Sequence, residues 1–245
     1  MNDSTSPIKM LRAAALGGMV LLAGCSCPCM SKKTASASAA STSATAPVAA
    51  QAATPATPGQ NFPESGILFD GKTLTHWISS DFAGRSSVTV SNGQINIGLG
   101  DMTGITLAGT NGLPRMNYEI SLDAMRTEGS DFFCGITFPV GKEDCSFIVG
   151  GWGGGTVGLS SINSEDASSN ETTQFKNFVN GKWHHIRVRV ETGKIQAWID
   201  EERMVNFDIE DKRLSIRFEV EPSLPLGIST WHTAAAYKNI QLKKL

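Results

Sequence analysis

The feature that most constrains the fold is an alternation of apolar and polar residues with a period of two, which runs through most of the chain after position 60. Residues 118–125 read Tyr-Glu-Ile-Ser-Leu-Asp-Ala-Met, so every second side chain is apolar. Successive side chains of a β-strand point to opposite faces of the sheet, and this period is therefore typical of strands that are buried on one face. The pattern predicts an all-β domain.

Further segments show the same pattern. Val88 and Val90 are separated from Ile95 and Ile97 by Ser91-Asn92-Gly93, and Asn-Gly between alternating segments indicates a tight hairpin. The other predicted strands are Phe132–Phe138, Ser146–Gly150, His184–Val190, Ile195–Ile199, Leu214–Val220, Leu226–Thr230 and Tyr237–Leu242. Only short stretches such as Asp166–Phe178 have room for a turn or two of helix. About a dozen strands with frequent turns favour a β-sandwich or jelly roll over residues 61–245.

The segment Trp183–Asp200 predicts a hairpin in register. With the turn at Glu191–Lys194, Val188 pairs with Ala197 on a buried face, and Arg187 lies opposite Trp198 on the other face. His185 lies on the same polar face. A Trp on the exposed face beside Arg and His predicts a sugar site at Trp198, Arg187 and His185; the alternative is a Trp that covers an Arg stem on a solvated sheet.

The N-terminus has the layout of a bacterial export signal. Lys9 and Arg12 precede an uncharged run that ends at Cys25, and the run is too short to span a bilayer. The string Leu22-Ala23-Gly24-Cys25 resembles a lipobox. We expect residues 1–24 to be a lipoprotein signal peptide and Cys25 to be lipidated, which would anchor the chain to the membrane of the bacterial cell envelope, periplasmic or surface-facing. The roles of Cys27 and Cys29 stay open.

Residues 25–60 consist largely of Ala, Ser, Thr and Pro. Such a composition offers no apolar periodicity from which a core could form, so it predicts a disordered linker after the lipidated Cys. About thirty residues of this kind would hold a domain a few tens of ångströms from the membrane.

The charge pattern excludes some partners. The net charge is −2 and no basic block occurs, which argues against a nucleic acid. No glycine motif that cradles phosphate follows a strand, so a nucleotide is not expected either. No cofactor is expected; calcium is an option for clustered acidic residues, but no motif supports it.

The opening string of the domain resembles a known family. Gly66-Ile67-Leu68-Phe69-Asp70-Gly71-Lys72-Thr73-Leu74-Thr75-His76-Trp77 is similar to the start of the 3-keto-disaccharide hydrolase family. Later agreement comes from Gly181-Lys182-Trp183-His184-His185, from Ile195-Gln196-Ala197-Trp198-Ile199-Asp200 and from Tyr237-Lys238-Asn239-Ile240-Gln241-Leu242. The resemblance spans roughly residues 62–245 and implies a concanavalin A-like, laminin-G-like jelly roll.

The resemblance also implies an activity, hydrolysis of a glycosidic bond in a 3-keto-glycoside. The strand after the Phe-rich segment often carries an acid in this family, whereas here it reads Cys145-Ser146-Phe147-Ile148-Val149-Gly150-Gly151-Trp152. No catalytic residue can therefore be carried over by motif. The alternatives are a non-catalytic laminin-G-like module that binds a glycan or a protein, and a structural envelope protein.

Candidate site residues follow from residue type alone. The acids and bases near the predicted hairpins are candidates for catalysis: Asp131, Glu143, Glu219 and His232. Trp152 stands before three glycines and Trp231 ends a predicted strand, so both are candidates to bind sugar at the rim of a site formed by Trp198, Arg187 and His185 on a concave sheet.

Two cysteines lie in the strands that flank Phe138–Gly141. If those residues form the loop, Cys134 and Cys145 fall opposite each other, and an oxidising compartment then favours a disulfide. Two free, buried thiols are the alternative.

Overall fold

The computed structural model describes residues 51–52, 61–63 and 66–245. The export signal, Cys25, Cys27 and Cys29 lie outside the described residues. Gln51–Ala52, within the range of the expected linker, pair with Val90 and Thr89 as a short antiparallel strand.

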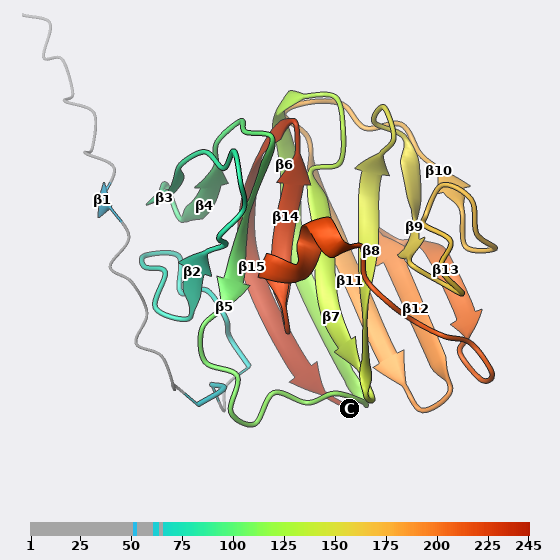
Figure 1. Ribbon diagram of the computed structural model, residues 1–245. Coiled ribbons are helices and arrows are strands. Elements are labelled where there is room, and N and C mark those ends of the chain that lie inside the picture. Colours follow the sequence, from blue (N-terminus) through green and yellow to red (C-terminus); the bar gives the residue numbers. More distant parts are fainter. Residues whose placement is uncertain (1–50, 53–60, 64–65) are drawn as a thin grey trace, which may run out of the picture. The chain divides into compact units, whose positions relative to one another are not determined.

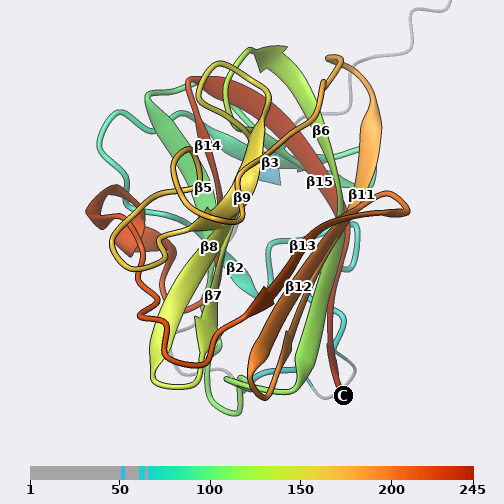
Figure 2. The same cartoon turned by 90° about the vertical axis from the view of Figure 1, so that its right-hand side faces the viewer.

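The described chain forms two antiparallel sheets that pack face to face, as the alternating pattern predicts (Figure 2). The eight-stranded sheet has the order β1 (Gln51–Ala52), β3 (Val88–Ser91), β4 (Gln94–Ile97), β15 (Thr233–Lys244), β6 (Tyr118–Gly129), β11 (Trp183–Glu191), β12 (Lys194–Ile199) and β13 (Glu202–Asp208). The seven-stranded sheet has the order β10 (Gln174–Phe175), β9 (Thr156–Ser160), β8 (Glu143–Gly151), β7 (Cys134–Val140), β14 (Gly227–Trp231), β5 (Met102–Leu107) and β2 (Trp77–Ser79).

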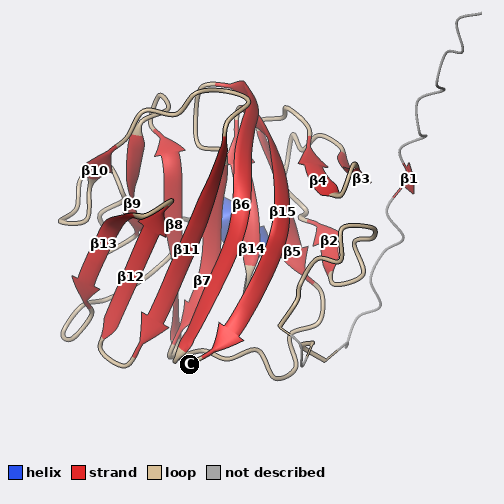
Figure 3. Cartoon of the chain, turned by 180° about the vertical axis from the view of Figure 1, so that it is seen from behind, coloured by secondary structure: helices blue, strands red, loops and turns tan. Residues whose placement is uncertain are grey.

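A short 3₁₀ helix, η1 (Phe218–Ser223), crosses the outer face of the seven-stranded sheet in front of β14 and β7 (Figure 1). From behind, the eight-stranded sheet faces the viewer and η1 lies on the far side (Figure 3). The prediction of a strand over Leu214–Val220 is therefore wrong. Leu214 makes only a single bridge to Ile162, and the chain then turns into η1.

The alternating apolar residues meet between the sheets. Ile186, Val188 and Ile195 of one sheet belong to the same buried cluster as Phe147 and Ile228 of the other. The two tyrosines also join the sheets, because Tyr118 donates its hydroxyl to the carbonyl of Pro139 at 2.6 Å and Tyr237 donates to Phe133 at 2.7 Å. Each buried hydroxyl is thus satisfied by the opposite layer, which fixes how the layers align.

The strands β5, β9 and β13 are not predicted by the sequence pattern. Every residue of β5 and β9 is buried, since η1 and neighbouring loops cover the outer face of the seven-stranded sheet. A strand that is covered on both faces loses its polar alternation. The segment Asp166–Phe178 holds turns and the two-residue β10 rather than helix.

Candidate functional site

A cavity of about 230 Å³ lies on the outer face of the seven-stranded sheet. Its floor consists of Ser146 and Ile148 of β8, Ser160 of β9 and Met102 of β5. Along these strands the alternate residues, such as Phe147 and Leu159, point into the core, so the floor residues necessarily face outward. The volume lies below the usual range of roughly 300–1,000 Å³ for ligand pockets, and it fits one small ring better than an oligomer.

One wall of the cavity contains Asp131, Phe132 and Trp152. The carboxylate of Asp131 accepts the backbone N–H of Phe132 at 2.7 Å and that of Gly153 at 3.1 Å. These bonds join the β6–β7 connection to the β8–β9 turn. Trp152 is 44% exposed and has a φ of +48°, in the left-handed region that a bulky residue rarely adopts. Such backbone strain is concentrated at functional sites.

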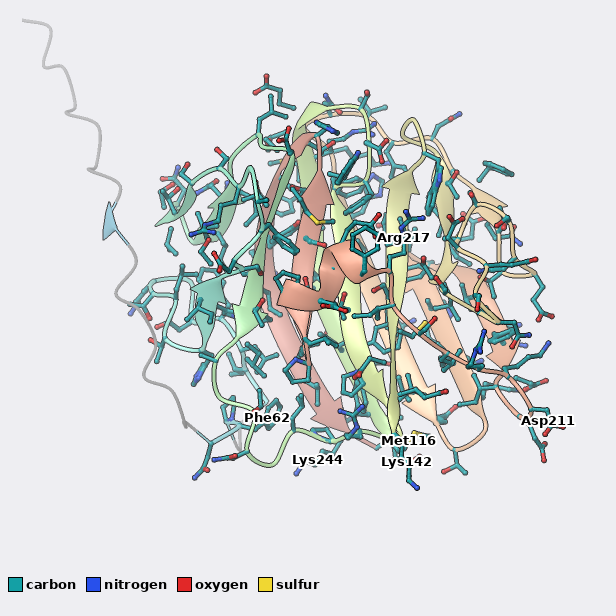
Figure 4. All side chains as sticks on the ribbon, in the orientation of Figure 1. Phe62, Met116, Lys142, Asp211, Arg217 and Lys244 are labelled. Carbon is teal, nitrogen blue, oxygen red and sulfur yellow. The ribbon has the colours of Figure 1, made fainter. Side chains whose placement is uncertain are left out.

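The facing wall is formed by η1 and the residue before it: Arg217, Glu219 and Val220. Arg217 donates to Glu219 at 2.8 Å and to Asp166 at 2.9 Å, so one guanidinium joins η1 to the loop after β9. Figure 4 shows Arg217 beside η1 over the front of the sheet. The hydrogen bond from Arg217 lowers the pKa of Glu219, although partial burial opposes the shift. Glu219 is therefore a carboxylate at neutral pH, in the form of a base.

The rim of the cavity carries Trp231, the last residue of β14. Its backbone N–H bonds the carbonyl of Phe132 at 3.1 Å, which ties the rim to the first wall. His232 follows it, with its ring edge-on to the indole at 4.8 Å, but His232 does not line the cavity. The structure thus brings together Asp131, Glu219, Trp152 and Trp231 from the predicted candidates and leaves His232 outside.

Glu143 makes hydrogen bonds that hold the scaffold together, away from the cavity. One of its carboxylate oxygens accepts the N–H of Leu214 at 3.0 Å, and its carbonyl accepts a bond from Arg115 at 2.7 Å. It begins β8 next to the β7–β8 turn and does not line the cavity. Glu143, one of the four acid or base candidates, therefore lies apart from Asp131 and Glu219, because the hairpin places it at its turn.

The predicted sugar site at Trp198 lies on the other side of the molecule. The predicted register is confirmed, since Arg187 pairs with Trp198 and its guanidinium carbon lies 4.5 Å from the indole centre. His185 bonds Asp123 at 2.7 Å on the same face. These residues occupy the outer face of the eight-stranded sheet, with the whole core between them and the cavity. Trp152 and Trp231 therefore cannot be the rim of a site at Trp198, and that part of the expectation is wrong.

Cys134 and Cys145 form no disulfide, and the alternative of two free, buried thiols is confirmed. Cys134 pairs with Val149 and Cys145 with Phe138, and both cysteines are free and buried. The predicted loop lies too early: the turn is at Gly141–Lys142, between Val140 and Glu143. Moving the turn shifts the register and separates the two thiols along the hairpin.

Neither a metal cluster nor a membrane-spanning helix is found in the described part of the chain. No group of three or more His, Cys, Asp or Glu side chains there is arranged to hold an ion. In the same residues, no helix has the length and apolar character needed to cross a bilayer.

Arg217 is the residue that sequence reasoning missed. It lies in no motif, and its segment alternates like a strand, which would place it on a solvated face. The exposed pairing of Arg217 with Asp166 joins residues 51 positions apart, and no local pattern signals it. Only the fold brings this cation to the cavity.

The fold and the cavity define a jelly-roll domain with an aromatic, charged site on one sheet. Residues 64–243 match the family described as 3-keto-alpha-glucoside-1,2-lyase-like domain, and the chain belongs to this family. This is the family that the opening string resembles, so the domain is carbohydrate-active in class. No curated protein matches the chain.

Solved structures support the fold. Crh5 transglycosylase in complex with NAG is similar with a TM-score of 0.51 and 12% identity, over 77% of this chain and 87% of that one. Its apo form gives 0.50 at the same identity and the same coverage. The carbohydrate-binding module CBM66 from Bacillus subtilis gives 0.41 at 11% identity, over 69% of this chain and 96% of that one. At these identities the Crh5 likeness speaks for the jelly roll alone.

Proposed function

We propose that the cavity beside η1 is a carbohydrate site and that the domain cleaves the glycosidic bond of a 3-keto-glycoside there. One observation carries the proposal: two tryptophans and three charged residues, from separate stretches of the chain, converge on one small cavity. They are Asp131, Trp152, Arg217, Glu219 and Trp231. The family to which the chain belongs supports the keto-sugar.

The lining suits a sugar ring. Indole faces cover the apolar C–H side of a pyranose, while carboxylates and the guanidinium bond its hydroxyls. Trp152 and Trp231 are 44% and 36% exposed, so each has free surface to offer a ligand. The cavity holds one ring, and the second part of a glycoside would extend past the rim.

The chemistry follows from the ketone. A carbonyl at C3 acidifies the hydrogen at C2, and a carboxylate can remove that proton. The electron pair of the C2–H bond then forms a C1–C2 double bond while the C1–O bond breaks, and the departing oxygen takes up a proton. Addition of water across the double bond would make the net reaction a hydrolysis. We assign proton removal to Glu219, which is ionised, and stabilisation of the enolate oxygen to Arg217.

The net charge of the cavity lining favours one class of sugar over another. Asp131 and Glu219 outnumber Arg217 in the lining, and Asp166 neutralises Arg217 further. This negative field would repel a uronic acid or a sulfated sugar, whereas a neutral glycoside has no net charge to be repelled. The substrate class is therefore a neutral keto-glycoside.

A non-catalytic binding module is the second candidate, and one observation favours it. Both carboxylates of the cavity are already held, Glu219 by Arg217 and Asp131 by two backbone N–H groups. Groups that are fixed in this way can position a ligand without moving protons. The tryptophans would then serve binding alone.

The same proposal includes a membrane tether. A lipid on Cys25 and the linker up to residue 60 would hold the domain at the cell envelope, where external glycans are within reach. The support is the lipobox-like string and the composition of the linker.

Release of p-nitrophenol from p-nitrophenyl 3-keto-α-glucoside tests the activity. We expect turnover by the wild type, a loss of about a hundredfold or more in kcat for Glu219→Gln, and a rise of about tenfold in KM for Trp152→Ala. Trp198→Ala on the opposite sheet is the matched control and should leave both values unchanged. Binding without turnover in the folded wild type would favour the module, and sensitivity to Trp198→Ala alone would move the site to the other sheet.

A further inference from the structure

Arg126 is a buried cation near the end of β6. Its side chain is on the core side of the strand, and the residue is 7% exposed. Its Nε donates to the side-chain oxygen of Asn180 at 2.6 Å and its Nη2 to the carbonyl of Phe178 at 2.6 Å. Its Nη1 makes a longer bond of 3.4 Å to the carbonyl of Asp131. These three acceptors are neutral oxygens from two loops.

Such a residue is an expensive way to stabilise a fold. Removing a cation from water carries a large desolvation cost, and apolar side chains of similar volume often stabilise a core at least as well. Burial lowers the pKa of Arg126, and the charge of Asp131 opposes this shift. The rigid fork of a guanidinium does offer one thing that an apolar side chain cannot, which is several fixed directions for hydrogen bonds.

One of the hydrogen bonds of Arg126 reaches the cavity wall that contains Asp131 and Trp152. Arg126 bonds the backbone of Asp131, and the carboxylate of Asp131 accepts the N–H of Gly153, the neighbour of Trp152. Gly154 fits closely here, because a Cβ at that position would lie 2.5 Å from the carbonyl oxygen of Ser130 and 3.0 Å from Nη1 of Arg126. The turn that carries Trp152 is therefore packed directly on the guanidinium.

The loop before β11 is also held by Arg126. Asn180 accepts from Arg126 and donates to the carbonyl of Gly129 at 3.2 Å, while the N–H of Gly181 bonds the carbonyl of Arg126 at 2.8 Å. The β6–β7 connection, the β8–β9 turn and the approach to β11 thus meet at one side chain. None of these contacts involves η1, which forms the facing wall.

We propose that Arg126 is a positioning residue that holds Asp131 and Trp152 in place as one wall of the sugar cavity, without touching the ligand. The role in ligand recognition rests on the function proposed above. The mechanical part, that Arg126 orders the turn bearing Trp152, does not depend on any ligand. The two parts can therefore be tested apart.

Amide hydrogen exchange of the full chain without sugar tests the mechanical part. Arg126→Lys keeps the charge but loses the fork, and we expect exchange in residues 150–155 to accelerate by about tenfold while residues 218–223 keep their wild-type rates. Arg115→Lys is the matched control, since Arg115 also bonds backbone carbonyls, at the β7–β8 turn. Figure 4 shows the neighbours Met116 and Lys142 at the lower end of the molecule, away from Arg217. Unchanged exchange in residues 150–155, or equal acceleration of both walls, would overturn the proposal.

A double-mutant cycle with p-nitrophenyl 3-keto-α-glucoside tests the link to the ligand. Arg126→Lys should raise KM about tenfold in the wild type, have little further effect in Trp152→Ala, and keep its full effect in Trp231→Ala. Equal effects in both backgrounds would contradict a specific link to Trp152. Should Arg126→Lys not fold, Asn180→Ala removes one acceptor of the same guanidinium and must give the same pattern. Absence of turnover in the wild type would count against the proposed function and leave the exchange result standing.

Discussion

The pair formed by Arg217 and Glu219 makes the η1 wall sensitive to acid. Hydrogen bonding to Arg217 lowers the pKa of Glu219 below its ordinary value of 4.5, so the folded state holds the ionised form more tightly than the unfolded state does. The stabilisation is therefore complete above the unfolded pKa and is lost as the pH falls through the folded pKa. Asp166, the other partner of Arg217, also has a lowered pKa: its own burial opposes the shift, and bonds from Ser168 and the charge of Arg217 outweigh it.

We predict that Glu219→Gln lowers the free energy of unfolding by about 0.5–1 kcal/mol at neutral pH, since the pair is partly exposed and screened by solvent. The difference from wild type should shrink as the pH falls below the unfolded pKa and through the lowered folded pKa of Glu219, below which the carboxyl group is protonated in both states. Urea unfolding from neutral pH into this acid range measures it. Glu221→Gln, on the same helix and outside the cavity lining, is the control. A difference that grows in acid would contradict the assigned pairing.

Residue type predicts many of the side chains that line the cavity. It does not predict which other residues those side chains contact. Asp131, Glu219, Trp152 and Trp231 are charged or aromatic residues near predicted strand ends, which makes them candidates, and they do converge on the cavity. Glu143 satisfied the same criterion equally well, yet it caps a backbone N–H at a turn. The difference lies in long-range contacts such as Arg217 with Asp166, for which local sequence carries no signal.

Among the elements, the hairpin of β11 and β12 was predicted residue by residue, whereas that of β7 and β8 was not. In the first, the turn contains Gly193 and the strands alternate strictly, so pattern and turn fix one register. In the second, Phe138-Pro139-Val140-Gly141 offers two places for a turn. The strands are buried on both faces, so alternation does not choose between them.

The resulting register predicts two unreactive thiols. Burial raises the pKa of Cys145 to about 12 and that of Cys134 still further, so little thiolate forms at neutral pH. In a chain with Cys25, Cys27 and Cys29 replaced by Ser, a thiol reagent should detect neither cysteine in the native protein and both after denaturation without reductant. Detection of neither after denaturation would indicate the disulfide that the structure excludes.

The helix η1 depends on a small cluster of its own. Val220 packs with Phe82 and Met102 on the outer face of the sheet, apart from the main core. We predict that Val220→Ala costs about 1 kcal/mol or less in global stability, because the cluster is small, but raises KM for the keto-glycoside by loosening the wall. Val149→Ala in the main core is the matched control: it should cost about 1–3 kcal/mol and leave KM unchanged. Equal effects of the two variants on KM would contradict a local role of η1.

For the whole molecule, alternation predicted the two layers but not which outer face carries the site. Both outer faces have polar residues and tryptophans, and the sequence pattern predicts the site on the face with the cleaner alternation, around Trp198. The face with the cavity is covered by η1, so its strands read as continuous apolar or small runs. The cover that makes a pocket also removes the pattern by which a strand is recognised.

The proposed tether makes a prediction about the whole chain. If Cys25 carries the lipid, cells that are fed a radioactive fatty acid should label the wild-type protein, which should fractionate with membranes. Cys25→Ser should remove the label and release the domain, because the residue that carries the lipid anchor is then missing. Cys27→Ser is the matched control two positions away and should keep both label and fractionation. Label that persists in Cys25→Ser and is lost only in Cys27→Ser or Cys29→Ser would assign the anchor to a neighbouring cysteine. An unlabelled wild type would leave the domain without the proposed anchor, while its cavity would still be expected to bind sugar.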